Sequence, residues 1–180
     1  MLGKRLQLLK DVFPRVFRLA VLRMPNFPTD QAQWNWLDRA SSAFNVKLIP
    51  KSMNQPDDLE PAFHAIRREH PDGLLVLNSP LALMLRKQLA DLAAGQRLPA
   101  IYPFTEVAEA GGLMSYGASR PDLFRQGATY VVKVLEGTKP AELSMVQPTK
   151  FELAVNVTTA KKLHLNIPDT LLALADKVIE

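Results

Sequence analysis

Apolar and polar positions alternate along this chain in a pattern that predicts short strands separated by helices. β-rich apolar runs occur at residues 16–22, 46–49, 73–77, 99–102 and 113–116. The run at 73–77 is apolar throughout, as in strands covered on both faces. Helical spacing fills the intervals, for example at Leu59, Phe63 and Ile66. The pattern predicts a flavodoxin-like, three-layer α/β fold with a parallel sheet.

The predicted helices share amphipathic spacing and several have clear start or stop signals. They cover residues 6–13, 29–45, 57–66, 81–94, 106–110 and 121–135. After residue 140 the pattern changes, because prolines punctuate two β-like runs, 143–146 and 151–157, that have no full helix between them. A short helix at 158–164 and an amphipathic helix from Asp169 to Ile179 are expected to follow. This last stretch is interpreted as a C-terminal appendage.

Composition and charge narrow the classes of protein that fit. The 180 residues are 47% hydrophobic, enough to bury one core, and 22 basic against 18 acidic residues give a net charge of +4. The basic residues are scattered, which argues against a nucleic-acid partner. The absence of cysteine excludes disulfides and thiolate metal sites but fits either the cytosol or an oxidising compartment.

The first residues do not resemble an export signal. Lys10 and Asp11 interrupt the stretch where an apolar region and a cleavage site would be needed. No uncharged apolar run reaches the length of a transmembrane helix. A cytoplasmic location is therefore expected if this sequence is the full product.

No motif for catalysis, metal binding or cofactor binding is found. Ser115 lacks the first glycine of a hydrolase nucleophile elbow, and His64, His70 and His164 have no ligand spacing for zinc. The loop after the first strand has no dinucleotide fingerprint, and Asn78 stands where a phosphoryl-accepting receiver needs an aspartate. The sequence predicts no enzyme, no cofactor and no metal.

Polar and aromatic residues at predicted strand ends indicate a small-ligand site instead, because ligands of open α/β sheets bind at the carboxyl ends of strands. Asn78 and Ser79 follow the third strand, and Tyr102, Phe104 and Thr105 follow the fourth. Tyr116 lies in the fifth. A plain helix cap is the alternative role for Asn78 and Ser79, and core packing is the alternative for each aromatic ring.

Four segments resemble a known protein family. They are GKRLQLLKDVFP, PDGLLVLNSPLAL, LPAIYPFTEVAEAGGLMSYG and QPTKFELAVNVTTAKKLHLNIPDTLLALADKVIE. The chain resembles ABC transporter substrate-binding proteins of the family that includes tryptophan and tyrosine uptake proteins. The likeness covers nearly all 180 residues and is most specific in GGLMSYG and QPTKFELAVN.

This resemblance implies a two-lobed, type I periplasmic-binding-protein clamshell that delivers a small polar ligand, such as an amino acid, to ABC permease subunits. It implies a linker helix at 1–14, the second lobe at 15–140, and a segment at 141–180 that returns to a first lobe most of which the sequence lacks. Ligand contacts are implied at Asn26, Asn78, Ser79, Tyr102, Phe104 and Thr105, with Tyr116 on the hinge side. A periplasmic or extracytoplasmic location is implied as well.

Three function classes stay open. The leading hypothesis is a non-catalytic solute-binding component of an ABC importer, or a truncated form of one. The alternatives are the ligand-sensing domain of a regulator, which shares the clamshell, and an enzyme on a flavodoxin-like scaffold. The uncovered apolar face of the C-terminal segment also suggests a homodimer through that segment.

Overall fold

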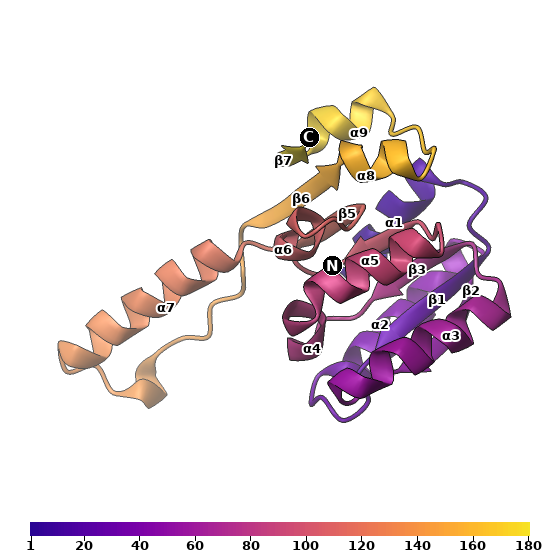
Figure 1. The fold of residues 1–180 in the computed structure, drawn as a ribbon. Coiled ribbons are helices and arrows are strands. Elements are labelled where there is room, and N and C mark those ends of the chain that lie inside the picture. Colours follow the sequence, from indigo (N-terminus) through magenta and orange to yellow (C-terminus); the bar gives the residue numbers. More distant parts are fainter.

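A seven-stranded sheet forms the centre of the molecule, seen here in a computed structural model that describes residues 1–180 (Figure 1). The strand order is β2-β1-β3-β4-β5-β6-β7. The first five strands pair in parallel, β6 is antiparallel to β5, and β7 is parallel to β6. The strands are β1 (Arg18–Arg23), β2 (Lys47–Ser52), β3 (Gly73–Val76), β4 (Ala100–Tyr102), β5 (Met114–Ala118), β6 (Phe151–Asn156) and β7 (Lys177–Ile179).

Helices cover both faces of this sheet, which confirms the predicted three-layer α/β fold (Figure 1). Short 3₁₀ turns lie at Pro56–Asp58 and Pro140–Glu142. None of the helices combines the length and the apolarity required to cross a membrane. The helices are α1 (Leu2–Val12), α2 (Asp30–Ala43), α3 (Leu59–Glu69), α4 (Pro80–Met84), α5 (Arg86–Gly95), α6 (Thr105–Glu109), α7 (Arg120–Leu135), α8 (Val157–Lys162) and α9 (Asp169–Leu174).

Each face of the sheet has its own apolar core, since successive strand residues point to opposite faces. On one face, α1, α2, α8 and α9 bury residues such as Leu9 and Leu37 against β1, β3 and β5. On the other face, α3 to α6 bury Phe63 and Leu89 against β1, β3 and β4. The two cores fix the strands, so the loops at the strand ends start from a rigid frame.

Residues 120–150 leave this body as a projecting arm (Figure 1). Helix α7 buries none of its residues. The predicted strand at 143–146 is wrong, because a 3₁₀ turn and irregular backbone occupy residues 140–150. The chain then returns to the sheet as β6, and the peptide N–H of Ser119 donates to the Lys150 carbonyl at 3.0 Å where the outgoing and returning segments meet.

Both ends of the chain pack on the sheet domain. Leu6 and Leu9 of α1 are completely buried in the core. In residues 151–180, β6 pairs with β5 from Ala118 to Met114. The expected last helix ends at Leu174, because Asp176 accepts the Leu153 N–H at 2.8 Å and draws the following residues alongside β6 as β7.

Candidate functional site

The carboxyl ends of β1 to β4 form one edge of the sheet. The strand order reverses at β1, because β2 lies on one side of β1 and β3 to β5 lie on the other. The point between β1 and β3 is therefore a topological switch point. Loops that diverge from such a switch point leave a crevice between them, which is where open α/β sheets bind ligands. The candidate site is therefore built from the strand-end loops, 24–29, 53–55, 77–79 and 103–104.

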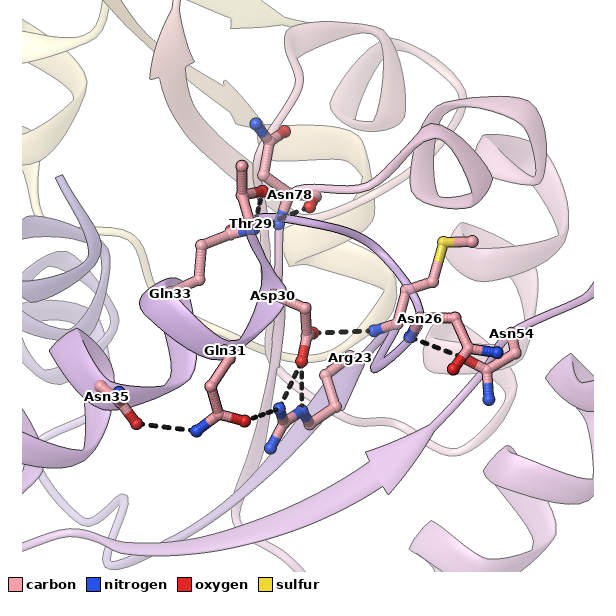
Figure 2. A network of polar contacts seen from close by, with 10 residues as sticks. Arg23, Asn26, Thr29, Asp30, Gln31, Gln33, Asn35, Asn54 and Asn78 are labelled. Atoms are coloured by element: carbon pink, nitrogen blue, oxygen red, sulfur yellow. Dashed lines mark hydrogen bonds and ion pairs between the residues drawn. The ribbon is translucent and has the colours of Figure 1, made fainter.

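Asp30 holds the first of these loops in place (Figure 2). Its carboxylate is almost fully buried and accepts two contacts from the Arg23 guanidinium, one of them from Nε at 2.9 Å. Its other oxygen accepts the Met24 N–H at 3.0 Å. Arg23 also lies over the Trp34 ring, 4.8 Å from its centroid. Both charges are thus satisfied within the protein, and their contribution to the site is to fix the loop.

Asn26 and Asn54 connect the loops that follow β1 and β2 (Figure 2). The Asn26 N–H donates to Asn54 Oδ1 at 3.2 Å, and the Asn54 N–H donates to the Asp58 carboxylate at 2.8 Å. The second bond lowers the pKa of Asp58, since it favours the ionised form. The Asn26 side chain is exposed at the edge of the sheet.

Asn78 is fixed through its backbone by a residue 45 positions earlier. Gln33 on α2 accepts the Asn78 N–H at 2.8 Å and donates to the Asn78 carbonyl at 2.9 Å. The Asn78 carboxamide is exposed (Figure 2). Ser79 has a different role, because its buried hydroxyl accepts the Ala82 N–H at 3.2 Å and caps α4. Asn78 therefore faces solvent while Ser79 forms the helix cap that was the alternative role.

Tyr102 lies in the core and not at the rim. It is fully buried, its hydroxyl has no hydrogen-bond partner, and burial raises its pKa well above the usual range. The ring packs so closely on Gly112 that a Cβ there would come within 2.7 Å of Tyr102 Cε2. Tyr116 is half-buried and stacks on Phe151 with ring centroids 6.0 Å apart. These two aromatic rings therefore contribute to packing in this structure.

Phe104 and Thr105 lie toward the base of the arm. Phe104 is half-buried and lies 5.9 Å from the Arg120 guanidinium. Thr105 lines a hollow of about 530 Å³ whose charges are largely paired, as in Arg120–Glu106 and Lys177–Glu109, both at 2.6 Å. No group of three or more His, Asp or Glu side chains is placed to hold a metal ion. Thr105 therefore lies near Arg120 and Lys150, where the arm begins and ends.

A second cavity, of about 580 Å³, lies between α1 and α2 and reaches the strand ends at Asn78. Half of its lining is apolar, and Trp36, which is 70% exposed, is the one aromatic side chain in it. We call this space the α1–α2 cavity. Its lining residues are Met1, Leu2, Gly3, Arg5, Thr29, Ala32, Gln33, Trp36, Ala40 and Asn78.

Sequence reasoning did not identify Arg23, Asp30, Gln33 or Trp36 as part of this region. Asp30 is recognisable in the sequence as an acidic residue in the first turn of a helix. Such a residue usually interacts only with the helix dipole, so it does not indicate a site. Gln33 and Trp36 occupy helix positions with no local feature that marks them. Their roles come from contacts with distant segments, such as the one between Gln33 and Asn78.

Comparison with solved structures shows the same fold in proteins that are longer than this chain. A conserved domain protein from Vibrio cholerae matches with 23% identity and a TM-score of 0.92, covering 98% of this chain and 60% of that one. An ABC domain in complex with L-Trp from Streptococcus pneumonia matches with 18% identity and a TM-score of 0.91, covering 99% and 62%. This chain therefore spans about 60% of the length of these two solved chains.

A LacI family transcriptional regulator from Bifidobacterium animalis is less similar, with 13% identity and a TM-score of 0.65 over 84% of this chain and 58% of that one. At these identities the likeness shows the fold alone. No curated protein sequence matches the chain. The family described as ABC transporter substrate binding protein matches residues 1–179, and the chain belongs to that family.

Proposed function

We propose that this chain is a non-catalytic solute-binding component of an ABC importer and that its strand-end loops form one side of a binding cleft. One observation carries the proposal. At the switch point of the sheet, the exposed side chains of Asn26 and Asn78 are presented on backbone that neighbouring residues hold in place. A preorganised edge of this kind binds a small polar ligand with little ordering cost.

The arm supports the proposal that a first lobe completes the cleft. Phe124, Val131 and Leu135 of α7 are 70%, 58% and 82% exposed, an apolar surface that needs a cover. The matched solved chains contain further residues beyond the 60% that this chain spans. We therefore assign the arm as the part of this chain that docks on a first lobe, with residues 118–120 and 149–151 as the crossing segments. Delivery to ABC permease subunits and an extracytoplasmic location belong to the same proposal.

Carboxamides favour a ligand that both donates and accepts hydrogen bonds. Asn26 and Asn78 supply such groups at the switch point, while Phe104 and Thr105 border the cleft near the arm. The Arg23 and Asp30 charges neutralise each other, so neither is free to pair with a ligand. An amino acid or a molecule of similar size and polarity fits this description.

A thermal-shift screen over amino acids, nucleosides and small organic acids tests the function. A ligand at ten times its dissociation constant raises the free energy of unfolding by about 1.4 kcal/mol, or the Tm of a chain this size by about 3–5 °C. Asn78→Ala should remove most of the shift. Asn35→Ala, which changes an exposed asparagine further along α2, is the matched control and should keep it. Absence of any shift at millimolar ligand would overturn independent binding by this chain.

A further inference from the structure

Arg5 is a buried cation without a carboxylate partner. Its side chain lies under the surface with 1% of the residue exposed, and burial lowers its pKa to about 10. Nε donates to the Tyr116 carbonyl at 2.7 Å, Nη2 lies 3.6 Å from the Met1 sulfur, and Nη1 has no hydrogen-bond partner. Leaving a buried charge without a counter-ion is strongly destabilising, so the position of Arg5 calls for a partner that the protein itself does not supply.

Arg5 is one of the residues that line the α1–α2 cavity, and no acidic side chain is among them. Arg5 is the one ionisable side chain in its lining, and the other polar side chains are those of Thr29, Gln33 and Asn78. Gln33 is already engaged with the Asn78 backbone, whereas the Asn78 carboxamide is free to bond a ligand. The volume of about 580 Å³ suits a molecule of ordinary ligand size.

The α2 side of the lining includes apolar residues and one flat ring beside its polar groups. Ala32, Trp36 and Ala40 follow each other at helical spacing on α2, and Leu2 faces them from α1. The Trp36 ring is 70% exposed, which leaves its area available for stacking. Met1 also lines the cavity, and its sulfur covers Arg5 Nη2 at 3.6 Å, while the residue is 56% exposed and so has room to move aside.

We propose that the α1–α2 cavity binds a flat apolar carboxylate that has no ammonium group, with the carboxylate on Arg5 and the ring on Trp36. This inference rests on the proposed function, because Asn78 belongs both to the strand-end loops and to the cavity, and it narrows the ligand from amino acids and molecules of similar size to acids without an amine. A carboxylate supplies the counter-ion that Arg5 lacks, and a charge-assisted bond to its guanidinium is of the stronger kind. An ammonium group finds no acidic partner in this lining and meets the Arg5 charge.

Fluorescence of Trp36 provides a direct test. The chain has two tryptophans, so a Trp34→Phe background leaves Trp36 as the one indole reporter. Three probes of the same size are titrated: phenylacetate, phenylacetamide and phenethylamine. We expect a saturable change with phenylacetate and at least about tenfold weaker binding of the two others, which corresponds to the loss of one charged contact. Equal binding of phenylacetate and phenylacetamide, or no saturable change with phenylacetate up to 20 mM (roughly the weak-binding limit), would overturn the proposal.

Variants assign the binding to this cavity. Arg5→Met should weaken phenylacetate binding at least about tenfold, while Lys4→Met, the same change at the exposed neighbouring cation, should leave it within about twofold. Ala32→Phe fills the cavity from the surface of α2 and tests the site even if Arg5→Met does not fold. Unchanged binding in a folded Arg5→Met or in Ala32→Phe contradicts the inference. If the screen above still gives Asn78-dependent shifts in those variants, the inference alone fails and the proposed function stands.

Discussion

Asp30 is the residue on which the geometry of the candidate site depends most. Its carboxylate joins the end of β1, the loop after it and the start of α2 through Arg23 and the Met24 N–H. Arg23 is itself mostly buried, with 13% of its side chain exposed. Removing one partner of a buried pair leaves the other charge without compensation, which costs more than the pair contributes.

Asp30→Asn should therefore lower the free energy of unfolding by about 3 kcal/mol, measured by urea denaturation. Asp91→Asn is the control, because Asp91 pairs with Lys87 on an exposed helix surface and its loss should cost less than about 0.5 kcal/mol. Equal effects of the two changes would show that the Arg23–Asp30 pair does not support the loop.

The residue scale is also where prediction from sequence was weakest. Asn78 was identified because an amide at the end of an apolar strand stands out, but its orientation depends on Gln33, which no local pattern connects to it. Tyr102 sits at a strand end like Phe104, yet the close approach of Gly112 makes it a core residue. Contacts with distant segments decide which side chains at a strand end face solvent. The local sequence pattern does not contain these contacts.

At the scale of elements, the loop between β4 and α6 packs tightly against β5 at Gly117. A Cβ at Gly117 would overlap the Pro103 carbonyl oxygen, which belongs to backbone and cannot move away easily. Gly127 lies in α7, where a Cβ meets no neighbour within 4 Å. The same substitution therefore has opposite consequences at the two positions.

Gly117→Ala should destabilise the protein by at least about 2 kcal/mol because of overpacking. Gly127→Ala should be neutral or stabilise it by up to about 1 kcal/mol, because alanine favours a helix. Thermal unfolding of the two variants beside the parent checks both. A neutral Gly117→Ala would mean that the loop after β4 is not held against β5 as described.

Elements with buried, strongly periodic sequences were predicted well, and the last residues were not. Helix α3 and strand β3 could be read from their apolar positions, because burial on the core dictates those positions. Lys177–Ile179 continued a helical pattern but forms β7, since pairing with β6 and the Asp176 bond to Leu153 prevail over local preference.

At the scale of the whole molecule, the arm and the sheet domain differ in how they are held. Trypsin should cleave first in the arm, at sites such as Arg125 and Lys133, because helix α7 buries none of its residues. Residues 151–180 should nevertheless stay bound after cleavage, since β6 lies between β5 and β7 in the sheet. Size-exclusion chromatography with mass spectrometry of the cleaved protein checks this. Release of the C-terminal fragment would instead place it with a separate lobe.

The central claim is that the strand-end loops at the switch point bind a solute. Its most direct test is a ¹⁵N NMR titration with a ligand that raises the Tm in the screen. The account predicts shifts concentrated at Asn26, Asn54 and Asn78, including the side-chain amide of Asn78, with Gln96 at the opposite edge unaffected. Shifts confined to the opposite edge, or a ligand that stabilises the protein without moving any strand-end resonance, would contradict it.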